Sequence, residues 1–275
     1  MDERPIHSPD LDWVNEQFRD QPPSVSGSSG AVALLVTGCP RSGTTLMLQS
    51  LQSSARCAVV DHLAAALWRR PDVGVLLSQH VAALAGPFSP SFHSKYGMTE
   101  NWREPHEFSY FWRDALDADP HAEDAVRSST TIDRCQQLIQ NAAGASQLPL
   151  AMKAFPALWI GDSLTSGADI GVVLMKRDKP SLRRSLIALW ERQPEKQWVS
   201  LRPHGWEAVM ARSLEYKVDF QIDALLHSTD ELAARLGDRC MKVDLSSLVA
   251  EDDRVVKVDE VLSWAERLSS GSNDA

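Results

Sequence analysis

The chain has 275 residues, 43% of them hydrophobic and 24% charged, a composition typical of a globular protein with one large domain or two small ones. Its formal net charge is −9, which argues against general nucleic-acid binding. The four cysteines, Cys39, Cys57, Cys135 and Cys240, form no Cys-x-x-Cys pair, so we expect neither a metal site nor a disulfide framework.

Residues 1–30 are expected to form a flexible N-terminal segment. Its first stretch, MDERPIHSPD, is charged and lacks the apolar core of a signal peptide. A short helix is predicted in LDWVNEQF, and QPPSVSGSSG reads as a tether. Because no apolar run in the chain reaches about 18 residues, we expect a cytoplasmic protein without a membrane partner.

The remainder predicts one domain over residues 31–268 and a loose tail over 269–275, with strands and helices in alternation. Nearly continuous apolar runs are typical of buried parallel strands, and apolar positions spaced by three or four residues indicate helices. Strands are predicted in 31–38, 55–62, 148–155, 170–178 and 239–248. Helices are predicted in 44–54, 63–70, 73–86, 180–193 and 258–268, in most of 207–237, and in the later part of the aromatic-rich region 87–147.

This alternation predicts an α/β fold, a P-loop-like three-layer sandwich with a central parallel sheet flanked by helices. Ligands of such sheets bind at the carboxyl ends of the strands. The polar residues expected at those ends are Gly38–Thr45, Asp61 with His62, Lys153 and Arg177. We expect these residues to meet at one edge of the sheet.

The first of these segments reads GCPRSGTT. The spacing of Gly38 and Gly43 matches the nucleotide-binding loop G-x-x-x-x-G-K-[ST], but Thr44 stands at the lysine position. ATP or GTP chemistry would lose a charge partner there, while Arg41 supplies positive charge earlier in the loop. Backbone N–H groups at a helix N-terminus favour a phosphate. The residues predicted to hold it are Pro40, Arg41, Ser42, Gly43, Thr44 and Thr45.

GCPRSGTT resembles the 5′-phosphosulfate loop of sulfotransferases that use 3′-phosphoadenosine 5′-phosphosulfate (PAPS). It is most similar to the P-R-S-G-T-T branch, which includes tyrosylprotein and bacterial small-molecule sulfotransferases. A second family signature is an arginine at a strand end with a serine eight residues later, as Arg177 and Ser185 are in RDKPSLRRS. The resemblance implies that this pair holds the 3′-phosphate. Lys153 is a weaker match to a family lysine, because K-A-F-P departs from K-[ST]-P.

The resemblance covers residues 31–192 and implies transfer of a sulfuryl group from PAPS to a hydroxyl or amine of a small-molecule acceptor. The product would be adenosine 3′,5′-bisphosphate, and no metal is implied. Arg41 is the residue chosen to stabilise the leaving phosphate, by charge and hydrogen bonds. Two alternatives stay open, a nucleotide-dependent kinase and a non-catalytic nucleotide-binding protein. The acceptor and the oligomeric state are not predicted.

Two places compete for the general base that takes the acceptor proton. One is Asp61 or His62, after the second strand. The other is His106 or Glu107 in WREPHEFSYFW, and a histidine base has a suitable pKa near neutral pH. The aromatic residues of this second segment are expected to wall a pocket and exclude water. They are Trp102, Phe108, Tyr110, Phe111 and Trp112.

Overall fold

The computed structural model of the chain describes residues 9–18, 31–95 and 97–270, and it confirms the parallel sheet. Five strands lie in the order β2-β3-β1-β4-β5, and every strand pair is parallel. The strands are β1 (Ala33–Gly38), β2 (Ala58–Val59), β3 (Leu150–Lys153), β4 (Ile170–Lys176) and β5 (Cys240–Asp244). The carboxyl ends of β1, β3 and β4 are therefore neighbours.

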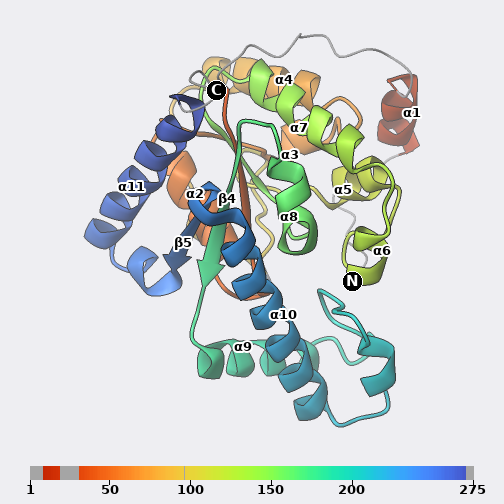
Figure 1. The fold of residues 1–275 in the computed structure, drawn as a ribbon. Helices are drawn as coiled ribbons and strands as arrows, with labels where there is room; N and C mark the ends of the chain where they lie inside the picture. The colour runs from red at the N-terminus through yellow and green to blue at the C-terminus, as the bar shows by residue number, and fades with distance from the viewer. Residues whose placement is uncertain (1–8, 19–30, 96, 271–275) are drawn as a thin grey trace.

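Helices cover both faces of the sheet, as a three-layer sandwich requires (Figure 1). Alternate residues of β1 point to opposite faces, so Leu34 and Val36 join one core while Ala33 and Leu35 join the other. The first core is closed by α2 (Thr44–Ser53) and α11 (Glu251–Ser270). The second is closed by α5 (Ser109–Leu116), α7 (Ile132–Ala145), α8 (Ala157–Thr165) and α10 (Leu214–Leu236).

Helix α9 (Lys179–Glu191) lies beyond the carboxyl end of β4, and α10 packs against it (Figure 1). The sequence explains where α9 begins. The Asp178 carboxylate accepts from the Ser181 backbone N–H at 2.8 Å, and Pro180 occupies the first turn. Leu182, Leu186 and Leu189 form its buried stripe, as predicted.

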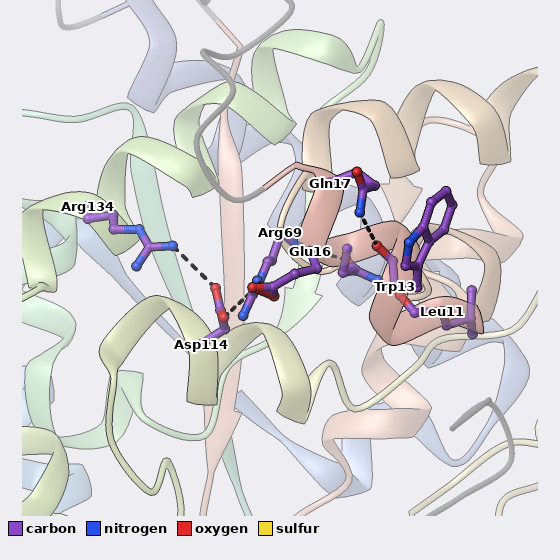
Figure 2. Close-up of polar contacts among 8 residues, drawn as sticks. Leu11, Trp13, Glu16, Gln17, Arg69, Asp114 and Arg134 are labelled. Atoms are coloured by element: carbon purple, nitrogen blue, oxygen red, sulfur yellow. Dashed lines mark hydrogen bonds and ion pairs between the residues drawn. The ribbon is translucent and has the colours of Figure 1, made fainter. Parts of the chain in front are cut away.

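The N-terminal helix α1 (Pro9–Gln17) confirms the predicted short helix and docks on the body of the protein (Figure 2). Arg69 donates to Glu16 of α1 and, at 2.8 Å, to Asp114 of α5. Arg134 of α7 lies 3.3 Å from the same Asp114 carboxylate. The predicted tether and the last residues of the predicted tail, 271–275, lie outside the described residues.

Three local predictions need correction. The second strand is only two residues long, because Asp61 already caps α3 (His62–Ala65). The next helix, α4 (Pro71–Ala85), begins at the proline rather than after it. The sequence reading missed α8, whose Pro156 and Gly161 resemble turn signals and whose Ile160 departs from helical geometry.

The remaining elements are α6 (Glu123–Arg127) and three short 3-10 helices, η1 (Trp206–Val209), η2 (Gly237–Arg239) and η3 (Leu245–Leu248). Among the described residues, no helix combines the length and the hydropathy of a membrane span.

Candidate functional site

The loop between β1 and α2 has the tight backbone that a phosphate loop needs. Gly38, Arg41 and Gly43 have φ angles of 149°, 72° and 100°. A Cβ at Gly38 would lie 2.6 Å from the Met175 carbonyl oxygen, and one at Gly43 would lie 2.5 Å from Leu245. Both positions favour glycine by conformation, and contact with a backbone oxygen also requires it at Gly38. Arg41 adopts the left-handed region without being glycine, a strain that clusters at functional sites.

The two sequence motifs meet in space. Arg41 Nε donates to Ser185 Oγ at 3.0 Å, although 144 residues separate them. Arg177 Nη1 donates to the Arg41 carbonyl oxygen at 2.9 Å. The end of β4 and helix α9 thus bring Arg177 and Ser185 against the loop. The predicted cofactor residues form one cluster.

Several positive charges act on one another in this cluster. Burial lowers the pKa of Arg41 from its ordinary value, and the charges of Arg177 and Arg192 lower it further. An anion placed among the three guanidinium groups would relieve their repulsion. Arg192, at the C-terminus of α9, was not singled out in the sequence because it belongs to no motif.

The first turn of α2 adds donors to the same place. In the part of the chain that the structure describes, the backbone N–H groups of Thr44 and Thr45 have no protein acceptor, as expected for the start of a helix. Thr45 Oγ1 donates to the Gly97 carbonyl oxygen at 2.7 Å. Lys95 and Met98, on either side of Gly97 in the sequence, pair in an isolated β-bridge.

Lys153 reaches this cluster from the end of β3. Its Nζ donates to Glu107 Oε1 at 2.5 Å and to the Gly97 carbonyl oxygen at 3.3 Å, and it lies 3.4 Å from Thr45 Oγ1. The side chains of Lys153 and Glu107 are only 13% and 22% exposed. Burial opposes ionisation of Glu107, but the charge and hydrogen bond of Lys153 hold the pKa of Glu107 below its ordinary value. Lys153 is thus part of the site rather than a surface lysine.

A cavity of about 750 Å³ opens at these strand ends, at the edge of the sheet that the fold predicts. All residues of the loop except the buried Ser42 line it, together with Lys153, Glu107 and Arg177, whereas Ser185 does not. Further lining residues carried no sequence signal, because separate segments bring them in. They include Lys95, Glu100, His121, Phe155, Leu189, Arg192, Glu195, Lys196, Val199 and Leu201.

Asp61 and His62 do not line this cavity. The buried Asp61 carboxylate accepts from Ala64 N–H at 2.8 Å and from Ser78 Oγ at 2.5 Å, so it caps α3. Burial raises the pKa of Asp61 above its ordinary value, against the effect of these hydrogen bonds. His62 Nε2 lies 3.0 Å from Thr99 Oγ1. Both side chains are thus engaged in local structure.

His106 lies behind the cavity wall. Its ring meets His62 edge-on at 4.7 Å, beside a small second cavity of about 40 Å³. Its Nδ1 accepts from the Phe108 backbone N–H at 2.9 Å, which places the proton of the neutral ring on Nε2. Burial, followed by the charge of His62, lowers the pKa of His106 to about 4. Glu107 alone of the four proposed base residues lines the main cavity.

The prediction that aromatic residues of this segment line the pocket is wrong for most of them. Phe108, Phe111 and Trp112 are fully buried and belong to the core under the sheet. Trp112 Nε1 donates to the Lys153 carbonyl oxygen at 2.8 Å, so this ring supports the end of β3. Tyr110 packs on Trp68. The sequence could not separate the two roles, because an aromatic run suits a core and a pocket equally.

Two solved structures share this architecture. Sulfotransferase STF9 from Mycobacterium avium has a TM-score of 0.52 and 13% identity, over 95% of this chain and 71% of that one. Sulfotransferase STF1 from Mycobacterium tuberculosis H37Rv has a TM-score of 0.50 and 16% identity, over 87% of this chain and 71% of that one. At these identities the likeness establishes the fold, so the chain has a sulfotransferase-type fold. No protein-family model and no curated protein matches the chain.

Proposed function

We propose that the protein is a sulfotransferase that moves a sulfuryl group from PAPS to a hydroxyl or amine of a small-molecule acceptor. The observation that carries the proposal is the convergence of Arg41, Arg177 and Ser185 on one phosphate loop. Each motif alone is short, but two motifs 136 residues or more apart meet within hydrogen-bond distance. The likeness to two sulfotransferase folds supports the same reading.

The residues present fit a ligand with two anionic ends. Burial lowers the pKa of Arg41, and repulsion from nearby positive charges lowers it further. An anionic ligand would neutralise that repulsion. The N–H groups of Thr44 and Thr45, with Arg41, would hold the 5′-phosphosulfate end. Arg177 and Ser185 would hold the 3′-phosphate, since a guanidinium fork matches phosphate geometry. PAPS would supply the sulfuryl group as the second substrate.

In this proposal the protein contributes position and charge. Arg41 stabilises the charge that grows on the leaving phosphate, and it does so without giving up a proton. Lys153 adds a second cation on the other side of the loop. The contacts of Asp61 and His106 with backbone groups disfavour them as proton acceptors, and the Lys153 ion pair makes Glu107 a weak base. No metal enters the proposal.

The test is ligand-dependent thermal stability followed by transfer. Adenosine 3′,5′-bisphosphate is expected to raise Tm more than ATP with Mg²⁺ does, because a ligand that binds only the folded state stabilises it by mass action. Transfer of radiolabelled sulfate from PAPS to a panel of small alcohols, phenols and amines should follow. Equal or reversed thermal shifts would refute the proposal in favour of a kinase.

The same experiment addresses a non-catalytic binding protein. Such a protein would show the larger shift with adenosine 3′,5′-bisphosphate and no transfer to any member of the panel. Arg184→Ala provides a matched control for the arginines of the site. Arg184 lies next to Ser185, but its exposed side chain bonds the Ser181 hydroxyl instead of the loop, so its removal should leave the thermal shift unchanged.

A further inference from the structure

A histidine, His121, lines the cavity from the segment between α5 and α6, and Asp119 lies beside it. His121 lines the cavity, with 22% of its side chain exposed. Its Nδ1 lies 3.7 Å from Asp119 Oδ1, and its backbone N–H donates to the same oxygen at 3.0 Å. The His121 side chain, followed by its backbone N–H and Arg202, holds the pKa of the Asp119 carboxyl well below its usual range. Asp119 is therefore a fixed negative charge beside the imidazole.

Three contacts fix the position of this ring. It stacks on Phe155 with the ring centroids 4.5 Å apart and 18° between the planes, and Phe155 follows Lys153 by two residues. The Arg202 backbone N–H donates to the His121 carbonyl oxygen at 2.7 Å. The Arg202 side chain forms an ion pair with Asp119. A buried aromatic face, a backbone pairing and a carboxylate thus orient the imidazole together.

One nitrogen of this imidazole is available for chemistry. Among the described residues, His121 Nε2 makes no hydrogen bond, and it lies across the ring from the Asp119 side. The charged groups around it are Asp119 with its partner Arg202, and Glu107, whose pKa the charge of His121 helps to lower. A base with a free nitrogen and an oriented second nitrogen is the arrangement that proton abstraction requires.

The geometry points to His121 as the residue that takes the acceptor proton, with Asp119 as its positioning residue. This inference rests on the sulfotransferase function proposed above. His121 Nε2 accepts the proton of the acceptor hydroxyl, whose oxygen forms a new bond to sulfur. The bond between sulfur and the 5′-phosphate oxygen breaks, and its electron pair stays on that oxygen beside Arg41. His121 then releases its proton to solvent.

The test compares acceptors that do and do not need a base. Near pH 8, 4-nitrophenol is largely ionised and phenol is not. The His121→Gln variant should lower kcat with phenol about 100-fold or more, and by less than about tenfold with 4-nitrophenol. Asp119→Asn should lower kcat with phenol about tenfold and move the pH profile of kcat/KM. His204→Gln is the matched control, because its exposed ring bonds Asp124 away from the cavity.

Thermal stability separates this inference from the proposed function. Adenosine 3′,5′-bisphosphate should raise Tm of the His121→Gln variant as much as it raises Tm of the wild type. Wild-type turnover of phenol by His121→Gln, or an equal loss with both acceptors, would overturn the role of His121 while leaving the function intact. A wild-type protein that adenosine 3′,5′-bisphosphate does not stabilise would instead overturn the proposed function, and this inference with it.

Discussion

Arg41 combines backbone strain with electrostatic strain. Its φ angle of 72° is one that glycine adopts freely, and its guanidinium is crowded by Arg177 and Arg192. A residue retained under both penalties is typical of a functional site. Stability and ligand binding should therefore respond differently when this side chain is removed.

The Arg41→Gly variant tests that separation. Relief of backbone strain and charge repulsion should offset the lost Ser185 hydrogen bond, so the unfolding free energy should change by less than about 1 kcal/mol. The affinity for adenosine 3′,5′-bisphosphate should fall at least about tenfold. Urea unfolding and calorimetric titration measure the two quantities. A large loss of stability with affinity retained would contradict this account.

The Lys153–Glu107 pair makes a second prediction at the residue scale. The Lys153→Met variant leaves the mostly buried Glu107 carboxylate without its cation, which should lower the unfolding free energy by about 2 kcal/mol. The double variant Lys153→Met with Glu107→Gln should recover part of that loss, because no charge is then stranded. Chemical unfolding of the four proteins in the cycle gives the coupling energy. Strict additivity would show that the two side chains do not interact.

Single elements explain what the sequence could and could not reveal about the site. Strand β1, its loop and α2 are contiguous, so GCPRSGTT predicted them together, and RDKPSLRRS likewise predicted β4 and α9. The elements that bring Glu107, His121 and Phe155 into the cavity come from separate segments. No local sequence pattern predicts these long-range contacts, because they depend on how segments of tens of residues fold over the sheet. Asp61 differs, because its role is local: it follows a strand as predicted and caps the helix α3 that begins at the next residue.

Helix α9 gives the prediction at this scale. The Asp178 carboxylate satisfies a backbone N–H at its start, and substitution of such a cap by alanine typically costs about 1 kcal/mol. Asp178→Ala should lower Tm by roughly 2–4 °C. It should also weaken binding of adenosine 3′,5′-bisphosphate, since Ser185 lies on the same helix. Asp230→Ala on α10, an exposed carboxylate that caps no helix, is the control. An unchanged Tm would mean that neighbouring contacts alone define the helix start.

Across the whole molecule, acidic composition and a basic cavity coexist. The chain carries a net charge of −9, yet six lysine or arginine side chains and three glutamates line the cavity. Net charge alone therefore does not predict the local charge of the cavity. The three-layer architecture was predictable from alternating strands and helices. The strand order was not, because the apolar runs of β1, β3 and β4 are interchangeable as sequence patterns.

Acid stability is a property of the whole fold that His106 should dominate. Its folded pKa of about 4 lies below the ordinary value of 6.5, so the unfolded chain binds more protons between these values. The stabilisation is complete above about pH 6.5 and is lost as the pH falls toward about 4. Between about pH 7.5 and about pH 5 the unfolding free energy should fall by about 1–2 kcal/mol from this group. Its charged and titratable neighbours are His62, Glu107 and Lys153.

The His106→Asn variant should flatten that dependence, because the asparagine oxygen can still accept from Phe108 N–H but takes up no proton. Urea unfolding at the two pH values measures the difference. His227→Asn, at an exposed position on α10, should behave like the wild type. The same slope in His106→Asn as in the wild type would assign the acid sensitivity to other groups.

The Gly97 carbonyl accepts hydrogen bonds from Thr45 Oγ1 and Lys153 Nζ, two donors of the phosphate loop region. A ligand oxygen that takes over these donors exchanges one acceptor for another, so the number of hydrogen bonds stays the same. What changes is the charge of the acceptor, since an anionic oxygen binds roughly twice as strongly as a neutral one. An anionic ligand would therefore gain more at these two donors than a neutral ligand would. Adenosine, which has the base and sugar but no phosphate, should gain nothing at these donors.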